Sequence, residues 1–186
     1  MKKTIHQSLL CLIFLMTGIY QDTFAQSWQK TTLNFAPDTV VSSAIVCDYD
    51  NAGTKYFAGY YYDIVNFDDG IFLWKVNSAG TITGKVKLTT NSSLWITQSV
   101  KAVKFISGAL YVAVDAKYQS GILDMDAFIM KFNTNLVKQW ERFQNRTGDP
   151  NDFGISIEAG PNTSVIFAGN SGTQGFINKY SRADGT

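Results

Sequence analysis

Histidine is almost missing from this sequence, and cysteine is nearly as rare. The chain contains only His6, Cys11 and Cys47, and the first two lie within a predicted leader described below. Without that leader, the chain can form neither histidine-dependent nucleophilic sites nor histidine metal sites nor an intrachain disulfide. We expect Cys47 to be a small, buried, apolar residue rather than a reactive thiol.

The sequence also lacks a hydrophobic run long enough to cross a bilayer. An apolar stretch at residues 9–16 follows Lys2 and Lys3 and precedes the small residue Ala25. This order of basic residues, short apolar core and small residue is typical of a secretory signal peptide. We predict a signal peptide over residues 1–25, cleavage near Ala25, no membrane span, and a secreted or cell-surface protein in the periplasm or outside the cell.

Neither sign of charge is in excess over residues 26–186. The full chain has 16 basic and 15 acidic residues, and removing Lys2, Lys3 and Asp22 leaves 14 of each. Because the chain has no basic cluster, we expect neither nucleic acid nor an anionic membrane surface as a partner. The remaining length suits one compact domain with a sizeable core.

What the sequence does contain is an internal repeat. YFAGYYY, YVAVDAK and IFAGNSG place Ala58, Ala113 and Ala168 at matched positions, 55 residues apart each time. A short apolar stretch precedes each segment, and a Phe-x-x-Lys segment follows it. This regular order predicts three structural units, at about residues 43–88, 99–143 and 153–186.

Each unit is predicted to be all-β. Short runs of Val, Ile, Phe and Tyr alternate with turn residues such as Asp-Asn-Ala-Gly and Asn-Ser-Ala-Gly. Four antiparallel strands fit one unit, the last of them at residues 82–88 and 136–143. Both faces of the Phe-x-x-Lys strand are apolar, as expected for a sheet packed between two neighbours. Stacked four-stranded sheets predict β-propeller-type blades, about three in this chain.

One unit resembles a known group of repeats. Asp126-Ala127-Phe128 with Lys131 and Trp140 is similar to the repeats of bacterial exported seven-bladed β-propeller proteins. Gly70-Ile71-Phe72 with Lys75 resembles them more weakly, because the first unit lacks the Trp. The resemblance implies a propeller fold and a secreted location, and it implies no catalytic residues.

The third unit stops after its Phe-x-x-Lys strand. Residues 27–35 precede the first unit, and Trp28 matches Trp140 when the following strands are aligned. We predict that residues 27–35 close the last blade. Three blades are fewer than the roughly four to eight of known propellers, so we also predict an incomplete propeller. Further repeats or a second chain would complete it, and open blade edges favour self-association.

The best candidate metal ligands are Asp48 and Asp50. The stretch DYDNAG begins like a calcium-binding loop, but Ala52 and Gly59 stand where the fifth and twelfth positions need oxygen ligands. We favour a hairpin turn in which Asp50 bonds local backbone groups. No cofactor is expected.

Tyr60, Tyr61 and Tyr62 are the candidate ligand-binding residues. Aromatic side chains at a blade edge can stack on sugar rings or anchor a protein partner. The alternative, which we favour, is that these rings pack between blades.

Two pairs of acids are candidates for a carboxylate site, namely Asp68 with Asp69 and Asp124 with Asp126. Proximity in sequence does not supply the opposed placement that a glycosidase needs, so turn hydrogen bonding is favoured. Lys75, Lys131 and Lys179 recur at one repeat position, which favours a structural role.

These observations predict a binding or scaffolding module for a glycan or a surface protein. The alternatives are a carbohydrate-active enzyme that uses propeller carboxylates, or a truncated, non-functional fragment.

Overall fold

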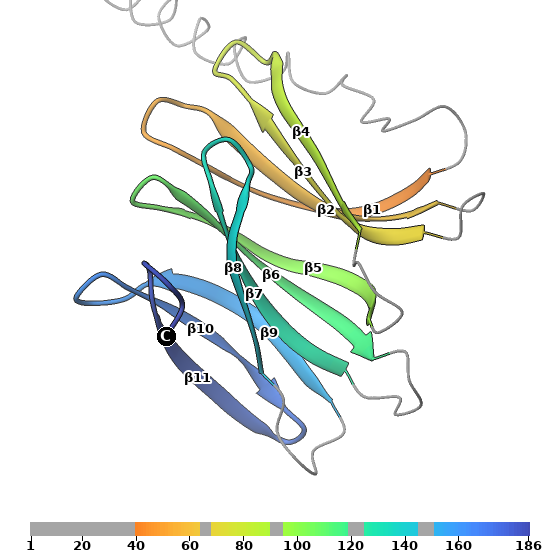
Figure 1. The fold of residues 1–186 in the computed structure, drawn as a ribbon, viewed down its shortest axis with the longest axis vertical. Helices are drawn as coiled ribbons and strands as arrows, with labels where there is room; N and C mark the ends of the chain where they lie inside the picture. The colour runs from red at the N-terminus through yellow and green to blue at the C-terminus, as the bar shows by residue number, and fades with distance from the viewer. Residues whose placement is uncertain (1–39, 64–67, 90–94, 119–124, 145–150) are drawn as a thin grey trace, which may run out of the picture. The chain divides into compact units, whose positions relative to one another are not determined.

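The computed structural model describes residues 40–63, 68–89, 95–118, 125–144 and 151–186 (Figure 1). These residues form eleven strands and no helix, so the all-β prediction is confirmed. A helix long and apolar enough to cross a membrane is accordingly not found in this part of the chain. The predicted signal peptide and the predicted closing strand at residues 27–35 lie outside the described residues.

The first sheet contains β1 (Val40–Tyr49), β2 (Lys55–Asp63), β3 (Asp68–Val76) and β4 (Ile82–Thr89), paired in that order. All neighbours are antiparallel. Two of the tight turns use glycines with positive φ, Gly53 at 76° and Gly80 at 87°. Glycine adopts this conformation without the steric cost that a side chain would add.

The second sheet repeats this order with β5 (Trp95–Ile106), β6 (Ala109–Tyr118), β7 (Met125–Asn133) and β8 (Lys138–Gln144). Ser107 and Gly108 both have positive φ, which matches the two-residue turn favoured between twisted antiparallel strands. The third sheet has three described strands, β9 (Asp152–Ala159), β10 (Ser164–Ser171) and β11 (Gln174–Ser181), with β10 in the middle.

The internal repeat is confirmed at the level of strand register. Ala58, Ala113 and Ala168 lie on β2, β6 and β10, the second strands of the three sheets. They pair with Leu73, Ile129 and Ile177 on the third strands. Matched residues therefore occupy matched positions and faces in all three sheets.

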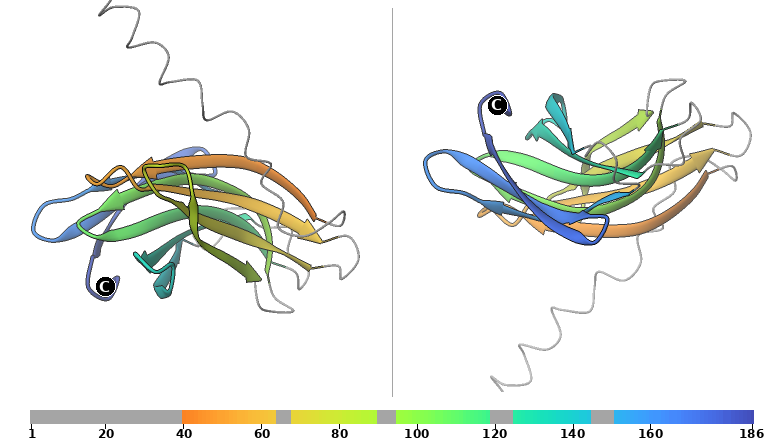
Figure 2. Two further views of the ribbon diagram at one scale, coloured as in Figure 1. Left: turned by 90° about the horizontal axis from the view of Figure 1, so that it is seen from above. Right: turned by 90° about the horizontal axis from the view of Figure 1, so that it is seen from below.

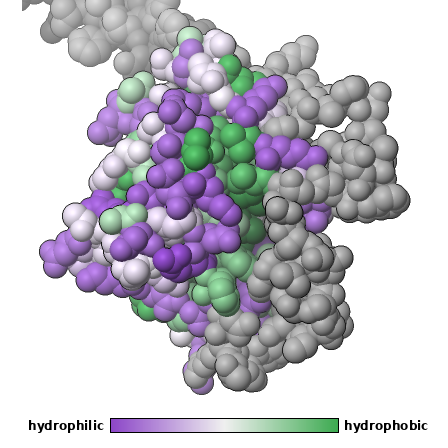
Figure 3. Space-filling model, viewed as in Figure 1, coloured by the Kyte–Doolittle hydropathy of each residue, from purple (hydrophilic) through white to green (hydrophobic). Residues whose placement is uncertain are grey.

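The three sheets follow one another in the fold (Figures 1 and 2), and two hydrophobic cores join them. The first core lies between the first and second sheets, where Tyr56 and Leu73 pack with Val112 and Phe132. The second core lies between the second and third sheets and includes Phe167. On the face shown in Figure 3, hydrophobic residues gather in a band beside a more polar surface.

Strand β6 contributes to both cores because its side chains alternate between the two faces of the sheet. Val112 and Val114 are fully buried in the first core, and Tyr111 and Ala113 are fully buried in the second. Burying each large apolar side chain contributes about 1.5–3 kcal/mol. The prediction that both faces of a unit are covered is thus confirmed for the second sheet.

Cys47 corrects one prediction. Its side chain is exposed rather than buried. Cys47 pairs with Phe57 across β1 and β2, and Phe57 is only partly buried. The apolar stretch around Cys47 does not reveal which of its residues the neighbouring sheet covers.

Candidate functional site

Asp50 forms the hairpin turn that the sequence predicts. Its Oδ1 accepts hydrogen bonds from the backbone N–H groups of Ala52 (2.9 Å) and Thr54 (2.8 Å). Its Oδ2 accepts a weak bond from the hydroxyl of Tyr56 at 3.4 Å. Burial acts to raise the pKa of Asp50, but the bonds from Thr54, Ala52 and Tyr56 together hold it below the ordinary value. Asp50 is therefore a charged turn residue.

Asp48 has a different partner, in the second sheet. Its Oδ2 accepts a hydrogen bond from the backbone N–H of Phe105 on β5 at 2.7 Å, which ties the first strands of the first two sheets together. Both candidate metal ligands thus have protein partners. Within the described ranges, no group of three or more His, Cys, Asp or Glu side chains could hold a metal ion.

The three tyrosines do not share one surface. Consecutive strand residues point to opposite faces, so Tyr60 and Tyr61 face different ways. Tyr61 is fully buried, and the Lys87 Nζ atom lies 4.2 Å from the centre of its ring. Tyr60 is half-buried, and the side chain of Tyr62 lies outside the described residues. Tyr60 is the one of the three with described access to solvent.

A buried carboxylate that the sequence analysis missed lies between the second and third sheets. Asp115 on β6 is completely buried, and its Oδ1 accepts the backbone N–H of Gly154 on β9 at 2.8 Å. Its Oδ2 lies 3.2 Å from the Nζ of Lys101 on β5. Asp115 therefore links three strands from two sheets.

Glycine at position 154 makes this close approach possible. A Cβ atom there would lie 2.9 Å from the ring of Phe167 and 3.5 Å from the Cβ of Ala113. The backbone of β9 can therefore approach Asp115 only where it carries no side chain. A detectable signal was present in the sequence, since Asp115 interrupts the otherwise apolar run YVAVDA.

Burial raises the pKa of Asp115 above its ordinary value of 3.8, although the Gly154 N–H and Lys101 act in the opposite direction. A raised carboxyl pKa can mark a catalytic acid. Here, however, the whole side chain is buried, so a substrate has no direct access to it. The arrangement is suited to holding sheets together.

The other candidate acids do not complete a carboxylate pair with Asp115. Asp126 is buried at 2% exposure and pairs with Ala116, the residue next to Asp115 on β6. Alternation along the strands therefore places Asp126 and Asp115 on opposite faces of the second sheet. Asp69 is half-buried. Asp124 and the side chain of Asp68 lie outside the described residues.

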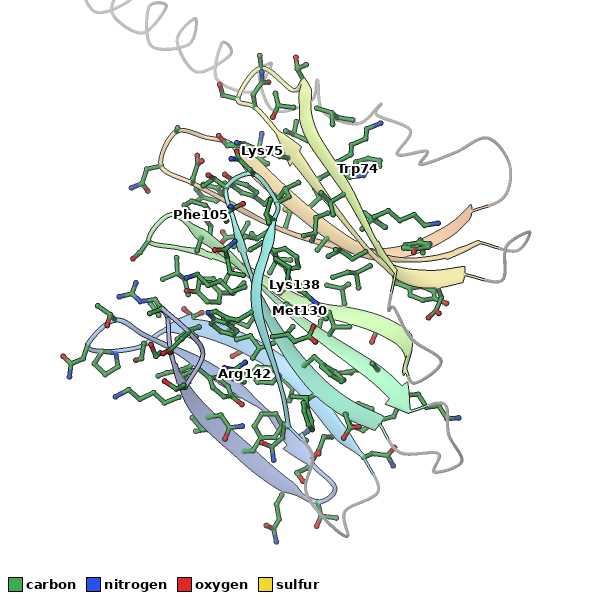
Figure 4. All side chains as sticks on the ribbon, in the orientation of Figure 1. Trp74, Lys75, Phe105, Met130, Lys138 and Arg142 are labelled. Carbon is green, nitrogen blue, oxygen red and sulfur yellow. The ribbon has the colours of Figure 1, made fainter. Side chains whose placement is uncertain are left out.

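Two lysines at one repeat position reach the following sheet. The Nζ of Lys75 donates a hydrogen bond to the backbone oxygen of Thr134 at 3.1 Å, in the turn between β7 and β8 (Figure 4). The Nζ of Lys131 donates to the backbone oxygen of Arg182, in the turn after β11. The structural role predicted for Lys75 and Lys131 is confirmed, and their partners are turn carbonyls. We call these two contacts the lysine clamps.

Strand β8 also holds the turn after β11. The Nε of Arg142 donates to the carbonyl of Gly185 at 3.1 Å, and its Nη2 atom donates to the carbonyl of Asp184 at 2.7 Å. Trp140 packs closely here, since a Cβ atom at Gly185 would lie 3.0 Å from its ring. The polar side chains described at the sheet junctions thus bind backbone groups, with the cations bonding carbonyls and the carboxylates bonding N–H groups.

Comparison with known proteins found no protein-family model and no curated protein that matches this chain.

Proposed function

We propose that this protein is an exported repeat protein with β-propeller-type blades, and that it acts as a binding or scaffolding module for a glycan or a surface protein. The proposal is supported by one observation: the polar residues at the sheet junctions bind backbone groups of the protein itself. The lysine clamps and Asp115 bind backbone groups of the following sheet. These residues therefore build a scaffold, and binding is left to side chains that differ between the units.

Exposed aromatic residues are the side chains best suited to such binding. Tyr49 lies at the end of β1 and is 69% exposed, next to the turn that Asp50 shapes. Tyr60 is half-buried on the neighbouring strand. A tyrosine ring can stack on a sugar or fill a pocket of a protein partner at a low entropy cost, because it has only two side-chain torsions.

The test is a glycan array and a pull-down from surface extracts, made with the full chain after processing by the cell. We expect a ligand whose affinity falls about tenfold or more in Tyr49→Ala or Tyr60→Ala, since stacking contributes about 1–2 kcal/mol. Val137→Ala is the matched control, because Val137 is also well exposed but lies in a different turn. Failure to find a ligand, together with measurable turnover of a substrate, would overturn the proposal.

A carbohydrate-active enzyme has less support. Among the acids considered above as metal ligands or as a carboxylate site, Asp48 and Asp50 accept hydrogen bonds from backbone N–H groups, and Asp126 is buried; Asp124 lies outside the described residues. If the protein were such an enzyme, single replacement of one of these residues by Asn would abolish turnover without unfolding the protein.

A further inference from the structure

The third sheet has one face, with both apolar and polar residues, that no described element covers. Its other face packs in the second core through Val165, Phe167 and Ile157. Cross-strand partners share a face, and Ile166 pairs with both Lys179 and Glu158, while Ala168 pairs with Ile177. We call this the outer face of the third sheet; by the same pairings it comprises Phe153, Ser156, Glu158, Ile166, Ala168, Asn170, Ile177 and Lys179.

Large apolar side chains are exposed on the outer face. Ile177 is 77% exposed and Phe153 38%, and Ile155, at the register break of β9, is 56% exposed. Single exposed apolar residues are ordinary, but several on one flat sheet face mark an interaction surface.

The internal repeat shows what this face is suited to bind. Leu73 and Ile129 hold the positions equivalent to Ile177, and both are completely buried by the following sheet. Lys75 and Lys131 reach carbonyls of that following sheet, whereas Lys179 at the same repeat position is exposed. The outer face therefore matches two faces of this chain that are each covered by another β-sheet.

A head-to-tail contact with a second copy of the chain would join two different faces, the outer face of one copy and the far face of the first sheet of the other. A symmetric contact requires only the outer face itself, which is available in both copies. Closed two-fold contacts of this kind are the commonest arrangement of identical chains.

The charges on the outer face are arranged for such self-pairing. Lys179, Ile166 and Glu158 form one row across β11, β10 and β9. A two-fold axis parallel to β10 places the β11 of one copy over the β9 of the other. Lys179 then lies opposite Glu158 of the second copy, and the pair occurs twice. Glu158 also contacts Lys104 of its own chain at 3.2 Å, but its side chain remains 62% exposed.

We propose that the outer face of the third sheet binds the same face of a second copy of this chain, giving a two-fold symmetric dimer. Ile177 and Phe153 supply its apolar contact, and two Lys179–Glu158 pairs fix its register. This inference goes beyond the proposed ligand binding and does not depend on it.

The size of the face predicts a weak, concentration-dependent dimer. Three strands of eight residues give a flat footprint of about 400 Å² per copy. Stable interfaces bury roughly 800 Å² per partner, so we expect dissociation constants in about the micromolar to millimolar range. The mass in solution should therefore rise with concentration.

Sedimentation equilibrium of the processed full chain, from about 10 µM to about 1 mM, tests this directly. We expect the wild type to approach the dimer mass and Ile177→Lys to remain monomeric. Val137→Lys is the control, because it adds the same charge at an exposed apolar residue outside the face. A wild type that stays monomeric throughout would overturn the proposal, as would equal loss of the dimer in both variants.

A charge exchange tests the two-fold geometry. Lys179→Glu and Glu158→Lys should each weaken self-association about tenfold or more, because like charges then meet twice. In an equimolar mixture of the two variants, opposite charges meet again at both positions, so mixed dimers should form. Absence of mixed dimers, with both variants folded by circular dichroism, would contradict the proposed axis. Glu158→Lys also creates a repulsion with Lys104 of its own chain, and mixing does not remove this repulsion. Dimers that form on mixing would therefore result from the restored pairs between the two chains.

Discussion

Tyr56 and Tyr111 occupy the same repeat position, but their hydroxyl groups have different surroundings. The Tyr56 hydroxyl donates to Asp50 at 3.4 Å. The Tyr111 hydroxyl is buried without a hydrogen-bond partner in the described structure, and burial raises its pKa, an effect that Arg182 partly offsets. An unsatisfied buried hydroxyl costs free energy, because it loses its bonds to water on folding. The first two units thus share the ring at this position and not the polar contact.

Replacing Tyr111 by Phe should therefore stabilise the protein. We expect the free energy of unfolding to rise by up to about 1 kcal/mol, because the orphan hydroxyl is removed and the ring is kept. Tyr56→Phe, the matched control, should lower it by about 0.5 kcal/mol through loss of the weak bond to Asp50. Urea unfolding followed by tryptophan fluorescence measures both changes. A Tyr111→Phe variant that is clearly less stable than the wild type would show that the hydroxyl has a partner.

Asp115 should make stability depend on pH. Because its pKa is raised in the folded protein, the folded state keeps its proton to a higher pH than the unfolded chain does. Its contribution to the free energy of unfolding is therefore fully present below pH 3.8 and is lost as pH rises through the raised pKa. Asp115→Asn removes this dependence and retains an oxygen acceptor for the Gly154 N–H.

The measurement is urea unfolding of wild type and Asp115→Asn over a pH series. The wild-type free energy of unfolding minus that of the variant should fall as pH rises from about 4, and should level off above the folded pKa. If this difference rose with pH instead, the contacts from Gly154 and Lys101 would outweigh burial, and the pKa would be lowered rather than raised.

At the scale of strands and turns, the lysine clamps connect successive sheets. The Lys131 ammonium bonds a carbonyl of the turn after β11, while Lys179 is exposed on the outer face. Lys131→Met keeps the apolar stem and removes a charge-assisted bond, so we expect a loss of about 1–2 kcal/mol in unfolding free energy. Lys179→Met should change it by less than about 0.5 kcal/mol in dilute solution. Thermal unfolding of both variants measures these changes. Equal losses of unfolding free energy in the two variants would contradict a stabilising role of the Lys131 clamp.

Strand positions were predictable from the sequence where apolar alternation and glycine turns coincide, as in β2 and β6. The start of β8 was not. The sequence predicted a strand from Leu136, but Leu136 has φ 62° and the strand begins at Lys138. The cause is Asn133, whose Oδ1 accepts the backbone N–H groups of Asn135 and Val137. A side chain thus extends the turn by two residues, and apolar periodicity does not report such a bond.

The candidate site was predicted less well than the fold, for a related reason. The turn role of Asp50 depends on neighbours in sequence and could be predicted. The burial of Tyr61 and Asp115 and the exposure of Cys47 depend on which face each sheet presents to another sheet. Those contacts join residues far apart in the chain, such as Asp115 and Gly154, so a local pattern does not reveal them.

The strands of the three sheets are not equally protected from solvent. Strand β6 has a partner strand on both edges and a hydrophobic core on both faces. Strand β11 pairs only with β10 among the described strands, and one of its faces is exposed. Stability in stacked repeats depends on contacts between neighbours, so the third sheet should open more readily than the second.

Amide hydrogen exchange should therefore rank the strands. We expect the slowest exchange in β6, faster exchange in β10, and the fastest of the three in β11. Phe167→Ala should widen the gap, because it removes a fully buried ring from the second core at a cost of about 3–5 kcal/mol. Exchange in β10 should then accelerate while exchange in β2 changes little, because no residue of β2 lies in the second core. Equal acceleration in β2, β6 and β10 would mean that the three sheets unfold as one cooperative unit, and that nearest-neighbour stacking does not govern their stability.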